Sequence, residues 1–164
     1  MTAAAQPPRD IDAVCADLVA ALAADGAPAA VSAVVRVVAA RTGRTIELRP
    51  VSLGGTEVFG LWVALADHDL ILYDRTATAA HRNHIVQHEL GHIVLEHRPL
   101  APQPPAETAD GWANSMCRSD FQDPIEEEAE LFARRLTWRL ARYSATAASS
   151  GVARRITDTL TGGG

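Results

Sequence analysis

Four of the six histidines of this chain lie in the stretch NHIVQHELGHIVLEH, residues 83–97. Two of them, His88 and His92, bracket a glutamate at the spacing H-E-x-x-H. Residues four apart on a helix share one face, so the two imidazoles can bind one zinc ion with Zn–N bonds of about 2.1 Å. Glu89 projects from nearly the same face and can act on a metal-bound water without binding the metal itself.

The H-E-x-x-H pattern indicates hydrolysis. Zinc lowers the pKa of a bound water molecule to about 7, and Glu89 can take its proton. The resulting hydroxide attacks a carbonyl carbon, and Glu89 can then pass the proton to the leaving amine. With six histidines in 164 residues, this pattern arises by chance in about one such chain in a hundred. A surface helix with a chance histidine pair is therefore the weaker interpretation.

A third ligand must come from another part of the chain. The long metzincin signature would need glycine at position 95 and histidine at position 98, but the sequence has Leu95 and Arg98. His97 misses the required position by one residue. A glutamate on a later helix is the other common solution, and the segment PIEEEAELFA offers three in succession.

Helical geometry selects among these three glutamates. At 100° per residue, one apolar stripe runs along this helix, formed by Ile125, Ala129, Phe132, Ala133, Leu136 and Leu140. Glu126 lies about 60° from the centre of this stripe, Glu128 about 95° from it, and Glu127 nearly opposite. A ligand must reach a metal ion beside the core, so Glu126 is the predicted third ligand. For Glu127 and Glu128, a solvated first turn favoured by the helix dipole is a sufficient explanation.

Two further residues are candidates for supporting roles. Glu130 follows Glu126 by one helical turn, so it could accept a hydrogen bond from a ligand imidazole and orient that ring. His84 precedes His88 by one turn and could line the cleft or bind substrate. The alternative for His84 is a solvated position on the helix surface.

The elements that carry these residues follow from changes in hydrophobic period along the chain. We expect two helices, then three strands, then three helices, with a long loop (98–124) after the H-E-x-x-H helix. The expected helices cover residues 10–24, about 29–42, 78–96, 123–143 and about 149–160, and the expected strands cover residues 45–51, 58–67 and 68–74. A tight turn at Asp67–His68 joins the last two strands into a hairpin.

The expected fold class is α+β, with a small three-stranded antiparallel sheet packed against the H-E-x-x-H helix and further helices in a zincin-like arrangement. The last strand, HDLILYD, should form the upper wall of the cleft, where an exposed edge could take an extended peptide. The length suits one domain, predicted at 10–160. Residues 1–9 are expected to be disordered, and residues 161–164 to form a flexible tail.

Composition and the N-terminus narrow the expected partners. The net charge of −5 argues against nucleic acid or an anionic membrane as the main partner. The opening MTAAAQPPRD lacks the pattern of a signal peptide, and the most apolar segment (29–40) is short and carries Arg36. These features predict a cytoplasmic protein with no membrane or direct nucleic-acid partner, and they leave its oligomeric state open.

The two segments that carry these residues resemble a known family. HELGH, followed by a loop and then IEEEAELFARRL, resembles the ImmA/IrrE metallopeptidase family, which pairs an H-E-L-G-H helix with a later helix of pattern E-x-E-A-N-x-F-A. Glu130 stands where the family usually has asparagine, and the resemblance covers roughly residues 30–140. The matching positions of the later helix are Glu126, Glu128, Ala129, Phe132 and Ala133.

The resemblance implies a gluzincin-type site with His88, His92 and Glu126 as zinc ligands and Glu89 as general base. It also implies a regulatory role, because proteases of this family cleave helix-turn-helix repressors encoded nearby. A Zn²⁺ cofactor and a helix-turn-helix repressor as protein substrate are therefore the expected partners of this chain.

Three functions fit the sequence. The first is a zinc metallo-endopeptidase that cuts a specific cytoplasmic protein. The second is a non-catalytic, metal-containing component, toxin-like or repressor-binding, and the third is a zinc hydrolase of a small amide metabolite. Glu89 favours catalysis over the second function, because a structural zinc site fills its coordination sphere with protein ligands and needs no base. A substrate groove along a free strand edge would favour the first function over the third.

Overall fold

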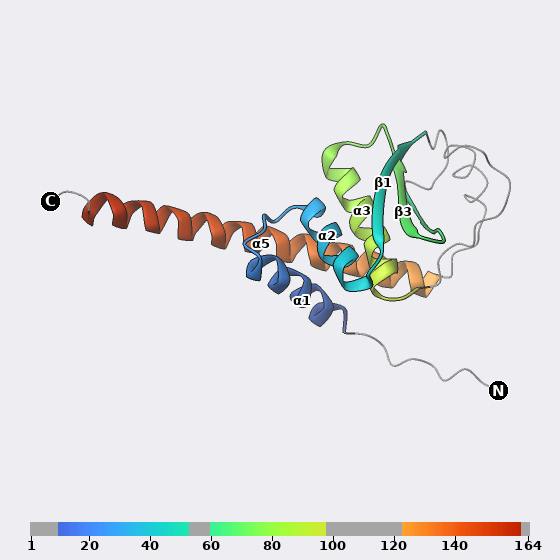
Figure 1. Cartoon of the computed structure of the whole chain (residues 1–164), viewed down its shortest axis with the longest axis horizontal. Coiled ribbons are helices and arrows are strands. Elements are labelled where there is room, and N and C mark those ends of the chain that lie inside the picture. Colours follow the sequence, from blue (N-terminus) through green and yellow to red (C-terminus); the bar gives the residue numbers. More distant parts are fainter. Residues whose placement is uncertain (1–9, 53–59, 98–122, 162–164) are drawn as a thin grey trace.

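The computed structural model describes residues 10–52, 60–97 and 123–161, with side chains to residue 150. It confirms the α+β class, and Figure 1 shows α3 between the sheet and the long helix α5. The tails expected at 1–9 and 161–164 and the loop expected at 98–124 fall almost wholly outside these ranges. In chain order the elements are α1 (Ile11–Ala24), α2 (Val31–Thr42), β1 (Thr45–Val51), β2 (Gly60–Ala64), β3 (His68–Asp74), α3 (Ala79–Val94) and α5 (Asp123–Thr161).

The sheet is mixed, so the prediction of an antiparallel sheet was wrong. Its strand order is β1-β3-β2. The hairpin of β2 and β3 is antiparallel as expected, but β1 pairs with β3 in parallel, from Thr45 opposite His68 to Val51 opposite Asp74. The expected running direction of each strand holds. What differs is the spatial order, because β3 lies between β1 and β2.

The burial of β3 gives the physical reason for this order. Four successive residues of β3 are buried, from Asp69 to Leu72, whereas burial alternates along β2 and is confined to two residues of β1. A strand covered on both faces is a continuous apolar run and belongs in the centre of a sheet. HDLILYD is therefore paired on both sides, which answers a question that the sequence left open: this strand offers no free edge to a peptide. Among the described strands, the two outer ones are β1 and β2.

The C-terminal part of the chain forms one helix where two were expected. The expected helices at 123–143 and 149–160 join into α5, which covers 39 residues. The intervening residues, mostly alanine, serine and threonine, contain neither proline nor glycine before position 151, so the helix continues after its apolar stripe ends. In Figure 1 its C-terminal part extends beyond all other elements.

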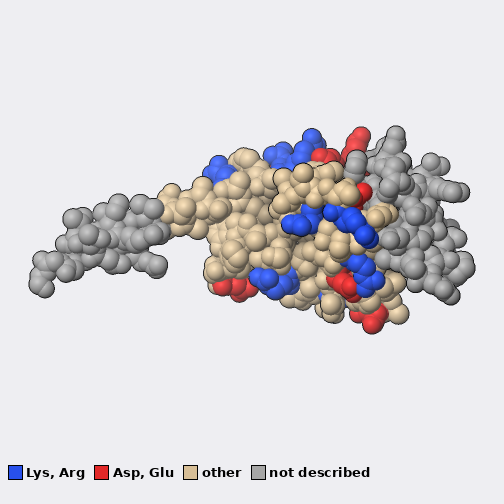
Figure 2. All heavy atoms as spheres, turned by 90° about the horizontal axis from the view of Figure 1, so that it is seen from above, with Lys and Arg blue, Asp and Glu red and all other residues tan. Residues whose placement is uncertain are grey.

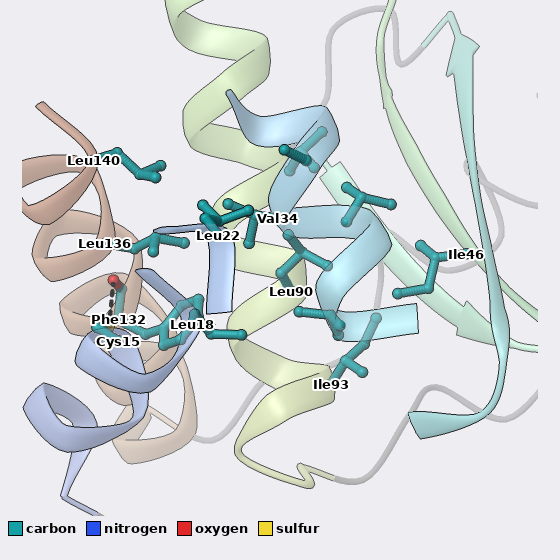
Figure 3. Packing of buried hydrophobic residues seen from close by; sticks show 14 of the residues in the cluster. Cys15, Leu18, Leu22, Val34, Ile46, Leu90, Ile93, Phe132, Leu136 and Leu140 are labelled. Atoms are coloured by element: carbon teal, nitrogen blue, oxygen red, sulfur yellow. Dashed lines mark hydrogen bonds between the residues drawn. The ribbon is translucent and has the colours of Figure 1, made fainter. Parts of the chain in front are cut away.

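The main core lies between α1, α2, α3 and α5, with α1 and α3 packed directly on α5 (Figure 3). Burial raises the pKa of Cys15 to about 12, so this residue is a thiol, and it donates a hydrogen bond to the Phe132 carbonyl at 3.7 Å. Further along α5, the Tyr143 hydroxyl donates to the Ala27 carbonyl at 2.8 Å. These contacts hold α5 against the N-terminal helices and so determine where its first turns face α3.

Gly91 allows α3 and α5 to approach closely beside the candidate ligands. A Cβ atom at this position would lie 3.0 Å from Phe132 Cδ1, 3.2 Å from Ala129 Cα and 3.3 Å from Ala129 O. Two of these three atoms are backbone, so they cannot move without moving α5.

We therefore expect Gly91→Ala to destabilise the fold and to weaken metal binding. Alanine favours a helix over glycine by about 1 kcal/mol, but overpacking a tight contact costs about 1–3 kcal/mol, and here the backbone cannot yield. Urea denaturation of the metal-free protein and a zinc titration measure the two effects. A variant more stable than wild type with unchanged zinc affinity would show that α3 and α5 can accommodate a methyl group at position 91.

Candidate metal centre

Helix α3 presents the histidines along a stripe beside its buried face. Its N-terminus is capped by Thr78, whose side chain accepts a hydrogen bond from the His81 N–H at 3.2 Å, and its apolar side chains pack into the core, namely Ile85, Val86, Leu90 and Ile93. His88 and His92 lie next to this face, with 20% and 10% of their side chains exposed. Their rings lie edge to face, 5.0 Å apart.

The structure brings the three predicted ligands together. His88 Nε2 lies 3.0 Å from Glu126 Oε2 and 3.2 Å from His92 Nε2. His92 Nε2 lies 3.5 Å from Glu126 Oε1. Their ligand atoms all lie within 4.8 Å of one another, and no other such group of three or more occurs among the described residues.

The donor set fits a tetrahedral zinc site. Two ligands at about 2.1 Å from zinc, at a tetrahedral angle, are about 3.4 Å from each other, close to the separations observed. Among the described residues, the buried atom Glu126 Oε1 has no hydrogen-bond partner. A buried oxygen without a partner is costly, and a metal ion between the three side chains would satisfy it.

The charges at this site are arranged for a cation. Burial opposes ionisation of Glu126, but the imidazoles of His88 and His92 outweigh it and lower the pKa of Glu126 to about 2. The carboxylate is therefore negative throughout the neutral range. Burial alone would lower the pKa of His88, but its hydrogen bond to Glu126 and the charge of Glu89 outweigh burial and raise it.

Zinc affinity should therefore fall as the pH is lowered through the histidine range. Zinc binds only the unprotonated imidazole, so a proton on His88 competes with the metal below its raised pKa. We expect a loss of about tenfold per pH unit for each displaced proton. Competition titrations with a chelator between about pH 8 and pH 5.5 measure the slope. A flat profile over this range would contradict His88 as a ligand.

Glu89 is buried between α3 and the sheet edge, with 7% of its surface exposed. Burial raises its pKa, although the charges of His88 and His92 and a hydrogen bond from the backbone of Trp62 act against this. A Cβ atom at Gly60 would lie 3.0 Å from Glu89 Oε1. The start of β2 thus leaves space for Ile85 and for this carboxylate because position 60 has no side chain.

Glu130 lies beside the ligand His88, and His84 lies beside Glu130. Glu130 Oε2 lies 3.6 Å from His88 Nδ1, too far for a well-formed hydrogen bond, and 3.0 Å from His84 Nε2. Glu130 therefore faces the far nitrogen of a ligand imidazole, but it is hydrogen-bonded to His84. His84 is 40% exposed, which suits either a cleft or a solvated position.

The contacts of His97 and Glu128 at the site were not predicted from the sequence. His97 Nδ1 lies 3.0 Å from His92 Nδ1, and His97 Nε2 lies 3.1 Å from Glu128 Oε2. Glu128 thus has a partner at the site, although helical angles assigned it to a solvated turn. Two features of the sequence could have indicated this contact: a histidine just past the end of the H-E-x-x-H helix, and the second glutamate of the E-x-E pattern.

Comparisons with protein-family models, with curated proteins and with solved structures give no match to this chain. Within the described residues, none of the helices combines the length and the apolar character needed to cross a membrane. On the face seen in Figure 2, arginines and acidic residues are interspersed.

Proposed function

We propose that this protein is a zinc-dependent metallo-endopeptidase that hydrolyses a peptide bond in a specific cytoplasmic protein. The observation that carries the proposal is the convergence of His88, His92 and Glu126 on one point, with the buried Glu126 Oε1 left without a hydrogen-bond partner among the described residues. Three protein ligands leave one coordination position open, which distinguishes catalytic from structural zinc sites. Zinc at this position supplies a Lewis acid that activates water and polarises a carbonyl.

Glu89 is the general base in this proposal. It takes a proton from the attacking water, whose oxygen forms a bond to the peptide carbonyl carbon. When the C–N bond breaks, Glu89 returns the proton to the leaving amine. Burial raises the pKa of this carboxyl group, which brings it closer to neutral pH, where a group that both accepts and donates a proton is most effective.

Among the described residues no strand pairs with the outer edge of β2, and this edge favours an extended peptide as substrate over a small amide. Leu65 N–H donates to the His68 carbonyl at 2.9 Å, and hydrogen-bonded pairs alternate in an antiparallel ladder. Gly60, Trp62 and Ala64 therefore direct their backbone groups away from β3. One of these groups, the Trp62 N–H, donates to Glu89. A peptide that adds to this edge as a strand would lie beside the general base.

A helix-turn-helix repressor is the proposed substrate, on the strength of the resemblance of HELGH and IEEEAELFARRL to the ImmA/IrrE family. The test is to incubate the zinc-loaded protein with helix-turn-helix proteins encoded next to its gene and to identify fragments by mass. We expect a single cut that a chelator abolishes and zinc restores. Binding without cutting would instead support the metal-containing binding component. Turnover of small amides alone would support the metabolite hydrolase.

A further inference from the structure

The ring nitrogen of His92 that faces away from the candidate metal position, Nδ1, contacts a second histidine, His97. His92 Nδ1 and His97 Nδ1 are 3.0 Å apart, and the two rings lie edge to face with centroids separated by 5.0 Å. The His97 side chain is only 7% exposed, and its other nitrogen lies 3.1 Å from Glu128 Oε2. A continuous row of polar contacts therefore runs from His92 through His97 to a carboxylate on α5.

The backbone at the end of α3 brings His97 to this position. The His97 N–H donates to the His92 carbonyl at 2.9 Å, and the Glu96 N–H donates to the Ile93 carbonyl at 3.2 Å. This pair of hydrogen bonds is the Schellman arrangement, which needs a left-handed residue where glycine is usual. Here that residue is Glu96, with φ of 56°. Left-handed backbone at a residue other than glycine costs about 1–2 kcal/mol, so the fold holds this turn against a local penalty.

The positions of the protons follow from the metal. If His92 binds zinc through Nε2, its Nε2 carries a lone pair and its proton must be on Nδ1. His92 Nδ1–H can then donate to His97 Nδ1 only if that atom is unprotonated. The His97 proton must therefore be on Nε2, where Glu128 accepts it. The opposite tautomer of His97 would place two N–H groups face to face at 3.0 Å.

We propose that His97 and Glu128 are positioning residues that hold the His92 ring and its tautomer ready for zinc. Glu128 selects the Nε2–H form of His97, and His97 in turn accepts the proton of His92. Partners of this kind affect metal affinity by about 10–100-fold when removed. The proposal rests on the metal centre of the proposed function, but it does not depend on which substrate is cut.

The test is a double-mutant cycle on zinc affinity, read by competition with a chelator. We expect His97→Ala to weaken zinc binding by about 10–100-fold and Glu128→Ala to weaken it by a smaller factor. The double variant should match His97→Ala alone, because Glu128 acts through His97. Glu127→Ala is the matched control, since Glu127 is the exposed neighbour of Glu128 on the same helix, and it should leave the affinity unchanged.

A second measurement reads the tautomer directly. In the zinc-loaded wild type, ¹⁵N-labelled histidine spectra should show His97 protonated at Nε2. Glu128→Ala should allow the other form to be populated. Glu128 is about half exposed, so its replacement by alanine keeps the fold even if His97→Ala does not.

Three outcomes would overturn the proposal. These are an unchanged zinc affinity in both single variants, equal effects of Glu128→Ala and Glu127→Ala, or a zinc-loaded wild type with the His97 proton on Nδ1. Each leaves the proposed function standing, because wild type still binds zinc. A wild type that binds no zinc overturns the proposed function together with this proposal.

Discussion

Glu126→Gln is expected to abolish zinc binding at stoichiometric concentrations. The substitution keeps the size of the side chain but replaces an anion, whose pKa lies at about 2, with a neutral amide. It removes the only negative ligand of the three, so the loss of affinity should exceed the roughly 10–100-fold typical of residues that merely support a ligand. His92→Ala should have an effect of the same order. Metal analysis after gel filtration, followed by chelator competition, measures both.

Neighbouring glutamates provide the controls for this prediction. Glu127→Gln should retain the metal, because Glu127 is exposed. Glu128→Gln should have an intermediate effect, because Glu128 contacts His97 and not the metal site itself. If Glu126→Gln kept full occupancy while Glu128→Gln lost it, the third ligand would be Glu128 and the helical-angle argument would be wrong.

The placement of the three ligands could be predicted because it depends on local helical geometry. His88 and His92 are four residues apart on one helix, and the angle of Glu126 to the apolar stripe of its own helix follows from sequence spacing. Only the packing of α3 on α5 is non-local, and the apolar stripes of these two helices determine it. Gly91 and Ala129, two small residues where the helices meet, set the distance between them.

The strand order could not be predicted in the same way. An antiparallel meander and the observed order β1-β3-β2 use the same strands running in the same directions. They differ only in whether β1 pairs with β2 or with β3, and this choice depends on which strand is covered on both faces. Residues 69–72 are buried in succession, but only Leu70, Ile71 and Leu72 are apolar, and a run of three apolar residues does not distinguish a central strand from an edge strand.

The contacts of His97 could not be predicted from the sequence for a different reason. Helical periodicity ends at Leu95, and the next residue has a left-handed backbone although it is a glutamate. Without that turn, the sequence gives no reason to place His97 beside His92. The angle of Glu128 to the apolar stripe of its own helix does not show that its side chain contacts a residue beyond the end of α3.

Glu89→Gln is expected to bind zinc as wild type does and to lose peptide cleavage by about 10²–10⁴-fold, the usual contribution of a general base. The amide is nearly isosteric with the carboxylate, but it cannot accept a proton from the attacking water. Cleavage of the helix-turn-helix substrate by wild type and by the variant, each at full zinc occupancy, measures the effect. The loss should lie in kcat, because the substitution leaves the strand edge and the three ligands in place.

The free energy of unfolding of metal-free Glu89→Gln shows whether the variant keeps the fold. Burial raises the pKa of Glu89 in the folded chain, so the ionised carboxylate favours unfolding once the pH exceeds the ordinary value of the unfolded chain. A neutral amide removes this penalty and should stabilise the metal-free protein near neutral pH by about 1 kcal/mol, a size common for single stabilising substitutions. Higher stability, unchanged zinc affinity and lost cleavage together assign Glu89 to proton transfer. Equal cleavage by both proteins would remove that role, and a variant that lost zinc would show that Glu89 acts on the ligands instead.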